Sequence, residues 1–411
     1  MIGRKNNPVD IKRLCLALCA FTLTATAFAQ SDETKPEYSA LEHLQRNLRA
    51  GSPKLAVPDV PQLIPQWKTE ASKKLRELLR VDASRSVALN PRKVETQKRD
   101  GYRLEKIIIS TEEYTDVPLL ILIPDGVSAQ NPAPAVLCIS GNVPGGKDEV
   151  AGERSNPEAA RGLDIYGDDY ARQIAKMGFV ALAIDLRNHG ERKYRSNSDL
   201  YKLNSSAEMM GVINSNALLI GKTFFGMNVF DLIRSIDYLE TRGEVEKDAI
   251  GAIGFSLGGN LAAWLAALDK RIKAVGIGGN WSSWRRLALR DINSDKYKFA
   301  NKPLHFMPHL SYQVIPDFFT YLDMNLSVAA AAPTPMIMSF EYENWQFDDI
   351  DEARSDMEPV RRAYSGTGAA DDLKIEYVSG PHKWRKDVIL PWFTDRLNRI
   401  SRSEITENKT R

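Results

Sequence analysis

The sequence predicts an α/β fold with a mostly parallel, doubly wound sheet. Two observations support this prediction. From about residue 103 onward, short apolar runs alternate with segments whose apolar residues recur at helical spacing. Strands that alternate with helices in this way are typical of a parallel sheet covered by helices on both faces. The chain has 411 residues, of which 43% are hydrophobic, and this is enough apolar material for one large core.

Residues 1–29 are expected to be a cleaved secretory signal rather than part of the fold. Residues 14–25 are apolar, and Ala27-Phe28-Ala29 gives the small-x-small pattern of a cleavage site. Basic side chains precede the apolar run at Arg4, Lys5, Lys12 and Arg13. We therefore expect a secreted, periplasmic protein whose mature chain begins near Gln30. The alternative is a retained membrane anchor, for which the apolar run is short.

Composition argues against several classes of partner. Removal of the signal would leave Cys138 as the only cysteine, in an apolar run typical of a packed core, so no intrachain disulfide is expected. The formal net charge is +2 and no basic stripe is interleaved with aromatic residues, so we expect no nucleic-acid partner. Neither a His-Glu-x-x-His pattern nor clustered Cys and His occurs, so no metal and no cofactor are expected. The oligomeric state is left open.

Residues 30–100 are expected to form an N-terminal extension. Residues 30 to about 60 are polar and rich in proline, as in a tail or a wrapping segment. Within residues 67–80, apolar side chains recur at helical spacing at Ala71, Leu75, Leu78 and Leu79. This pattern predicts an amphipathic helix whose apolar face docks on another part of the chain.

Residues 101–400 are expected to form the main domain, followed by a polar tail at residues 401–411. The expected strands, of which the first two are antiparallel, cover residues 103–110, 118–123, 135–140, 179–185, 249–254, 273–278, 335–340 and 373–378. The expected helices cover residues 171–177, 229–236, 257–268 and 392–400, and glycines end the first two.

The alternation of strands and helices breaks between residues 281 and 332. This stretch is too long for a simple connection and is rich in aromatic residues. It is either an insertion that covers a pocket or a plain packed excursion, and the sequence favours neither. The aromatic residues are Trp281, Trp284, Phe306, Tyr312, Phe318, Phe319 and Tyr321.

Gly254-Phe255-Ser256-Leu257-Gly258 is the pattern that indicates chemistry. It lies between an apolar strand and an alanine-rich helix. A serine on such a sharp turn projects its hydroxyl above the edge of the sheet, where it can act as a nucleophile. A free hydroxyl is a weak nucleophile and needs a base. Of the five histidines, only His382 follows the last expected strand, where the chain order Ser, acid, His places the base.

The acid that orients His382 is expected just after the strand at residues 335–340. The candidates among the carboxylates that follow that strand are Glu341, Glu343, Asp348, Asp349 and Asp351. Glu341 follows the strand so closely that we expect it to shape the turn. An oxyanion hole needs two backbone N–H groups, and we expect them from Leu257, after the nucleophile, and from Asn142, in the loop after the strand at residues 135–140.

That loop also matches a phosphate-binding pattern. Residues 141–147 fit G-x-x-x-x-G-K after a strand. The next residues are Asp148 and Glu149 rather than a serine or threonine, so the hydroxyl that would hold Mg²⁺ is missing and two carboxylates would repel phosphate. We therefore do not expect nucleotide binding.

On these motifs the chain resembles the α/β-hydrolases grouped with dienelactone hydrolases and acetyl xylan esterases. The resemblance runs from about residue 67 to the closing helix and rests on residues 134–141, 178–185 with 190–192, 254–259, 332–335 and 380–382. It implies an α/β-hydrolase fold with an insertion before the acid-bearing strand. It also implies structural roles for Asp185 and Arg187, and by spacing it places the acid at Glu343, with Asp348 as the rival.

Two departures from the family are visible. The family often has His-Gly where this chain has Ser140-Gly141, and dienelactone hydrolases have a cysteine where this chain has Ser256. The expected activity is hydrolysis of carboxylic esters, with acetyl or other acyl esters of carbohydrates implied by the resemblance. Two alternatives are a peptidase or amidase related to prolyl oligopeptidases and a non-catalytic binding protein. The stretch before the first strand is too short for the propeller domain of those peptidases, and an intact Ser256 and His382 argues against the binding protein.

Overall fold

The computed structural model describes residues 40–410, apart from 83, 85, 195–205, 280–282, 290–297, 300–301, 304–310 and 342–349. The chain divides into two compact units, residues 1–50 and 51–411. The described part of the first unit is helix α2 (Ala40–Ala50), within a stretch for which we expected only a tail or a wrapping segment. All that follows concerns the second unit.

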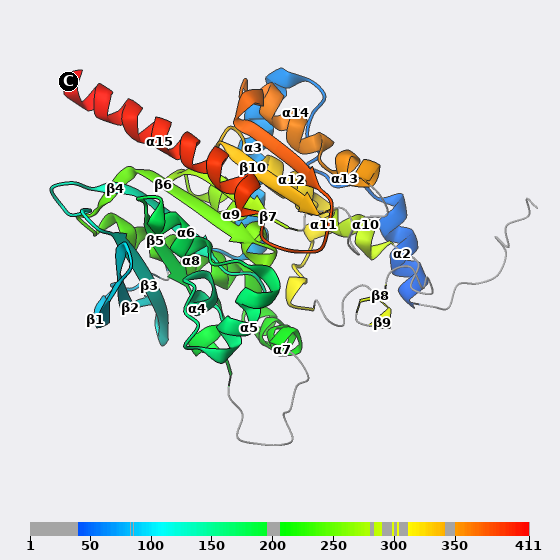
Figure 1. The fold of residues 1–411 in the computed structure, drawn as a ribbon. Helices are drawn as coiled ribbons and strands as arrows, with labels where there is room; N and C mark the ends of the chain where they lie inside the picture. The colour runs from blue at the N-terminus through cyan, green and yellow to red at the C-terminus, as the bar shows by residue number, and fades with distance from the viewer. Residues whose placement is uncertain are drawn as a thin grey trace, which may run out of the picture. The chain divides into compact units, whose positions relative to one another are not determined.

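A nine-stranded sheet forms the centre of the described fold (Figure 1). Its first four strands, in spatial order, pair antiparallel and the remaining neighbours pair parallel, as expected for a mostly parallel α/β sheet. The spatial order is β1 (Arg92–Arg99), β2 (Tyr102–Glu112), β3 (Thr115–Pro124), β5 (Val180–Ile184), β4 (Ala133–Ile139), β6 (Val245–Phe255), β7 (Ile272–Gly278), β10 (Met336–Glu341) and β11 (Leu373–Val378).

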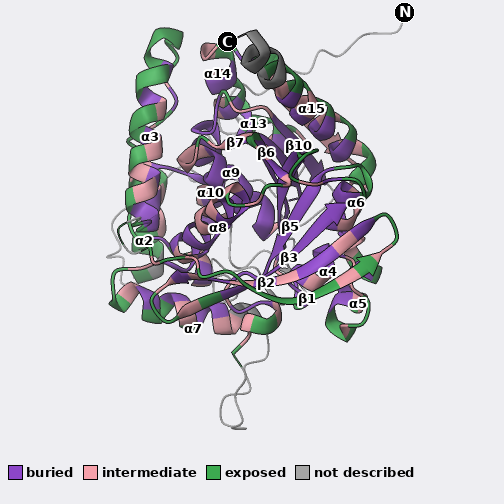
Figure 2. Cartoon of the chain, turned by 90° about the vertical axis from the view of Figure 1, so that its left-hand side faces the viewer, coloured by how far each residue is buried: buried purple, intermediate pink, exposed green. Residues whose placement is uncertain are grey.

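Helices cover both faces of this sheet, as Figures 1 and 2 show. Strand β4 divides its side chains between two hydrophobic clusters, because successive residues of a strand point to opposite faces. Leu137 and Ile139 belong to the cluster that also holds the buried faces of α3 (Ile64–Leu79), α8 (Phe224–Glu240) and α9 (Leu257–Leu268). Val136 and Cys138 belong to the cluster with α6 (Tyr170–Lys176) and α15 (Lys386–Thr410). Cys138 is buried, as its apolar surroundings predict.

The docked helix predicted for residues 67–80 is confirmed as α3. Its side chains Ala71, Leu75 and Leu79 have no exposed surface and belong to the larger cluster. Two features at the edges of the expected domain differ from the prediction. Strand β1 is largely exposed and polar, and it joins the sheet ahead of residue 101. Helix α15 continues to Thr410, through the segment expected to be a polar tail.

The remaining described helices and a small hairpin connect these elements. They are α4 (Lys147–Val150), α5 (Pro157–Tyr166), α7 (Ser206–Leu219), α10 (Trp284–Ala288), α11 (Phe318–Tyr321), α12 (Met324–Ala329), α13 (Ile350–Asp356), α14 (Glu358–Gly366) and the strands β8 (Lys298–Phe299) and β9 (Lys302–Pro303). Within the described residues, no helix is both long enough and apolar enough to cross a membrane.

The aromatic stretch before β10 is packed where the structure describes it. The rings of Trp284 and Phe318 lie 5.6 Å apart, and both contact the ring of the fully buried Trp264 on α9. These side chains act as core, as in the packed excursion that the sequence left possible. Trp281 and Phe306 lie outside the described residues.

Candidate active site

Ser256 lies on the tight turn that joins β6 to α9. Its backbone has φ 55° and ψ −119°, a conformation that costs a residue other than glycine on the order of 1–3 kcal/mol. The Ser256 N–H donates to the carbonyl of Gly278 at 2.8 Å and anchors the turn to β7. A Cβ at Gly258 would lie 2.0 Å from the Ile139 oxygen, so only glycine fits there. The strand–turn–helix arrangement predicted from the motif is therefore formed.

His382 lies beside this turn. Its imidazole stacks on the ring of Phe255, with centroids 4.5 Å apart and an interplanar angle of 23°. On another side it contacts Gly279, where a Cβ would lie 2.6 Å from His382 Cε1. Phe255 immediately precedes Ser256 in the chain. Gly279 immediately follows Gly278, whose carbonyl accepts the hydrogen bond from the Ser256 N–H. The loop after β11 thus brings the predicted base to the predicted nucleophile.

Glu341, the last residue of β10, is a described carboxylate that faces His382. It is fully buried, and its Oε2 lies 3.6 Å from His382 Nδ1, while Ser339 Oγ donates to its Oε1 at 3.2 Å. The expectation that Glu341 only shapes the turn is therefore wrong. Parallel pairing of β10 with β11 sets Glu341 opposite Val378, at the start of the loop that carries His382.

The other candidate acids divide into two groups. Glu343, the residue selected from the sequence, lies with Asp348 and Asp349 outside the described residues. Asp351 is described, and its side chain is 82% exposed and paired with Arg354 at 3.0 Å. Within the described chain, Glu341 is thus the carboxylate that forms an ion-pair contact with His382.

The loop after β4 lies next to Ser256. A Cβ at Gly141 would lie 3.0 Å from the Phe255 oxygen and 3.6 Å from Ser256 Cβ, so a larger residue there would crowd the turn. Asn142 follows Gly141, and Leu257 begins helix α9. Both backbone N–H groups that the sequence predicts for an oxyanion hole therefore belong to segments that border the nucleophile. The N–H groups at a helix N-terminus lack intrahelical partners and can bind an anion.

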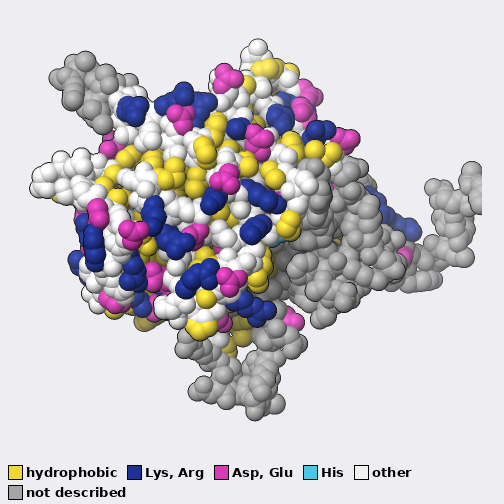
Figure 3. Space-filling model, in the orientation of Figure 1, with side chains coloured by type: hydrophobic (Ala, Val, Ile, Leu, Met, Phe, Trp, Pro, Cys, Tyr) yellow, Lys and Arg dark blue, Asp and Glu magenta, His cyan; other side chains and the backbone are white. Residues whose placement is uncertain are grey.

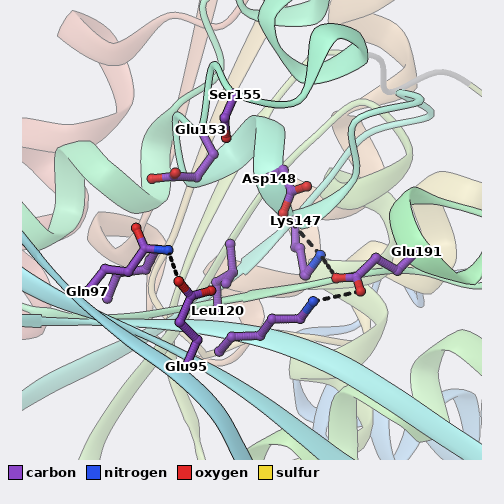
Figure 4. Close-up of a pocket in the computed structure, with 10 residues that line it drawn as sticks. Glu95, Gln97, Leu120, Lys147, Asp148, Glu153, Ser155 and Glu191 are labelled. Carbon is purple, nitrogen blue, oxygen red and sulfur yellow. Dashed lines mark hydrogen bonds and ion pairs between the residues drawn. The ribbon is translucent and has the colours of Figure 1, made fainter.

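Lys147, which the phosphate-binding pattern would place on a nucleotide, is buried among carboxylates instead. Its Nζ lies 3.0 Å from Asp148, 3.1 Å from Asp185 and 2.5 Å from Glu191 (Figure 4). The cavity of about 240 Å³ drawn there is lined by residues of β1–β3 and α4 and by Glu191, and it includes none of the predicted catalytic residues. The Lys147 ammonium therefore pairs with these three carboxylates and holds the loop in place.

Asp185 and Arg187 brace this region from the end of β5. Asp185 is fully buried and accepts hydrogen bonds from the N–H groups of Lys147 (2.7 Å) and Glu191 (3.0 Å). A Cβ at Gly190 would lie 2.1 Å from the Asp185 carboxylate, at a φ of +51° that also favours glycine. Arg187 donates to Asp231 at 2.9 Å. These contacts fit the structural roles implied by the resemblance.

Two buried carboxyl groups behind the site were not predicted. Glu149 on α4 and Asp168 after α5 have no exposed surface. Burial and, to a smaller extent, the neighbouring Asp168 raise the pKa of Glu149 to about 9. Burial also raises the pKa of Asp168 to about 6. Both residues look like ordinary surface acids in the sequence, because only the fold packs Gly145 and Gly162 against Glu149.

Glu149→Gln is expected to flatten the dependence of stability on pH. The folded pKa of Glu149 is raised, so the folded state holds a proton that the unfolded state releases above about pH 4.5. The free energy of unfolding should then fall as pH rises from about 5 to about 9, by up to about 1.4 kcal/mol per pH unit for each proton held. Urea unfolding at pH 5 to 9 measures this slope, which the variant should lose in part. Asp164→Asn, at an exposed acid of α5, is the control, and equal slopes in Glu149→Gln and wild type would contradict the assignment.

The other histidines serve no described site. His189 is buried, its Nδ1 lies 3.0 Å from the Arg187 oxygen, and burial lowers its pKa to about 4, so it stays neutral. His305 and His309 lie outside the described residues. Among the described side chains, no group of His, Cys, Asp and Glu is arranged to hold a metal. On the face drawn in Figure 3, basic and acidic side chains are interspersed.

Comparisons with known proteins agree with this fold. Residues 37–387 match the model of the Abhydrolase family. A protein of Bacillus subtilis (strain 168) named as a hydrolase, YtaP, is 26% identical over 298 residues, which are 71% of this chain and 87% of YtaP. A Bacteroides fragilis structure described as an acetyl xylan esterase is 24% identical, with TM-score 0.67 and coverage of 85% of this chain and 84% of that one. A glucuronoyl esterase from Solibacter usitatus is 16% identical, with TM-score 0.53 and coverage of 90% and 99%.

Proposed function

Because the chain belongs to the Abhydrolase family and has the α/β-hydrolase fold, we propose that it is a serine esterase that hydrolyses carboxylic esters. The single observation that carries this proposal is the arrangement at the ends of β6, β10 and β11. Ser256 stands on a strained turn, His382 packs beside that turn, and the buried Glu341 faces His382 Nδ1 at 3.6 Å. Chain order is Ser, acid, His, as in other enzymes of this fold.

The proposed reaction has two steps. In the first, His382 takes the hydroxyl proton as Ser256 Oγ attacks the ester carbonyl carbon, and it then passes that proton to the departing alcohol. The bond between the carbonyl carbon and the alcohol oxygen breaks and leaves an acyl group on Ser256. In the second, water attacks the acyl group, His382 takes a proton from the water and returns it to Ser256 Oγ, and the acid is released.

Glu341 and two backbone N–H groups assist both steps in this proposal. The Glu341 carboxylate accepts from His382 Nδ1–H, holds the tautomer whose Nε2 is free to take a proton, and stabilises the imidazolium that forms. The N–H groups of Leu257 and Asn142 donate to the oxygen that becomes negative in each tetrahedral intermediate, a contribution worth about 3–4 kcal/mol per donor in enzymes of this kind.

The proposed substrates are acyl esters of carbohydrates, acetyl esters first among them. Support comes from the acetyl xylan esterase and glucuronoyl esterase structures that share this fold, and at their level of identity the support is an analogy. A peptidase of the prolyl oligopeptidase class is the alternative enzyme, and the two solved structures named above that share this fold are esterases. A non-catalytic binding protein is disfavoured by the complete set of Ser256, His382 and Glu341.

A panel of acetyl, feruloyl and methyl esters of sugars tests this function. The full chain should release acid from at least one of these classes and should be labelled covalently by a fluorophosphonate, which reacts with activated serines. If the protein turns over a peptide amide but none of the esters, the result would favour the peptidase. If the protein is not labelled and turns over none of the esters, the result would favour the binding protein.

We also propose that the protein acts outside the cytoplasm, as a chain freed of residues 1–29 and carrying its catalytic domain in the unit of residues 51–411. The basic start and the Ala27-Phe28-Ala29 pattern support export, and the segment itself lies outside the described residues. N-terminal sequencing of protein from the periplasm of the producing cell should begin near Gln30. An intact Met1 would contradict this.

A further inference from the structure

Arg385 lies between the acid and the loop that carries the base. Its Nη2 donates to the carbonyl of Pro381 at 2.9 Å and lies 3.4 Å from the carbonyl of Ser379. Its Nε lies 3.8 Å from Glu341 Oε1. The side chain is 22% exposed, so water screens this pair less than it would a surface pair. One guanidinium therefore contacts both Glu341 and the turn that ends in His382.

The turn is built around this arginine. Gly380 has φ +113°, and a Cβ there would lie 2.9 Å from Arg385 Nη2, so the guanidinium occupies the space that any other residue would fill. Trp384, the residue before Arg385, is buried, and its backbone N–H donates to the Tyr166 carbonyl at 3.1 Å. The loop is thus pinned at Trp384, and Arg385 folds back from that point over the residues that lead to His382.

The charge of Arg385 matters because Glu341 is fully buried. A buried carboxylate must be compensated by hydrogen bonds or by an opposite charge. Ser339 supplies a hydrogen bond without charge, and His382 is neutral when it acts as a base. Arginine keeps its proton at every pH that an esterase meets, so it supplies a constant positive charge at Glu341.

We propose that Arg385 is a positioning residue, which sets a positive charge beside Glu341 and holds the Gly380-Pro381-His382 turn so that Glu341 and His382 Nδ1 stay in register. The proposal rests on the proposed function, since it assumes that Glu341 is the acid. Arg385 itself touches neither the substrate nor Ser256 in this role. It acts through the two residues that it ties together.

Two substitutions separate the charge of Arg385 from its hydrogen bonds. Arg385→Met removes both, and Arg385→Lys keeps the charge but loses the planar fork that reaches several oxygens at once. Removal of a cation favours proton uptake by the Glu341–His382 pair, whichever group takes the proton. The acid limb of kcat/KM for a small acetyl ester should therefore move about one pH unit upward in Arg385→Met. It should stay in place in Arg385→Lys, while kcat falls about 10- to 100-fold in Arg385→Met and less in Arg385→Lys.

Lys386→Met is the matched control, because it removes an exposed cation next in the chain that lies on the same helix start. Its acid limb and kcat should equal those of the wild type. Circular dichroism and the unfolding temperature show whether each variant is folded, and rates are expressed per folded molecule. An unmoved acid limb in folded Arg385→Met would overturn the proposal, because a purely structural arginine would lower kcat without moving the limb.

The double variant Glu341→Gln/Arg385→Met separates this proposal from the function on which it rests. If Arg385 acts through Glu341, the double variant should be no slower than Glu341→Gln alone, since residues that act as a unit are not additive. Equal losses from Arg385→Met with and without Glu341 would overturn the positioning role and leave the esterase in place. Wild-type turnover in Glu341→Gln would instead remove Glu341 from the proposed function.

Discussion

Ser256→Ala is expected to lower kcat for ester hydrolysis by about 10⁶-fold without loss of the fold, as in other enzymes that use such a serine. The Oγ is the atom that forms the acyl-enzyme, and no neighbouring hydroxyl on the turn can replace it. Alanine keeps the Cβ, so the strained backbone at φ 55° is disturbed no more than by serine. Initial rates with an activated acetyl ester and labelling by a fluorophosphonate measure the loss.

Ser235→Ala provides the control for this experiment. Ser235 is buried on α8 and donates to the Asp231 carbonyl at 2.8 Å, away from the turn. Its loss should cost some stability and leave turnover per folded molecule unchanged. Turnover near the wild-type rate in Ser256→Ala would remove the nucleophile assignment, and with it the proposed mechanism.

The turn that carries Ser256 could be predicted from sequence because its signal is local. Within residues 254–258, the glycines and the serine specify a turn that needs close contact between β6 and α9, and the structure contains it. His382 could be predicted from chain order, since the fold places its base after the last strand. Both predictions depend on short stretches of chain. The predictions that Cys138 is buried and that helix α3 forms depend on short stretches too.

The position of the proposed acid depends on how two strands pair, and the sequence does not display this pairing. The position of Glu341 at His382 follows from the parallel register of β10 with β11, and the spacing argument that favoured Glu343 treats Glu341 as part of a turn. The same limit explains why Glu149 and Asp168 looked like surface acids. It also explains β1. The residues of β1 are mostly polar and form no buried face, and this segment is a strand because it pairs with β2.

The second large effect is expected at the acid. Glu341→Gln should lower kcat by about 10⁴-fold, because a glutamine donates as well as accepts and can hold the imidazole tautomer whose Nε2 carries a proton and cannot take one from Ser256. The change is isosteric, and Ser339 Oγ, 3.2 Å from Oε1, can still donate to the amide oxygen. The fold should therefore survive. Steady-state rates from pH 5 to 9, with circular dichroism of the variant, measure the effect.

Glu343→Gln is the matched comparison, since it makes the same change two residues further along the chain. With Glu341 as the acid, Glu343→Gln and Asp348→Asn should both stay within a few-fold of wild type. A loss of about 10⁴-fold in Glu343→Gln together with near-normal turnover in Glu341→Gln would return the acid to the residue selected by spacing. In that case the buried Glu341 carboxylate, 3.6 Å from His382 Nδ1, would have to be a packing partner of the loop. A carboxylate so close to the base makes that outcome the harder one to explain, because its removal would then have to leave the proton affinity of His382 unchanged.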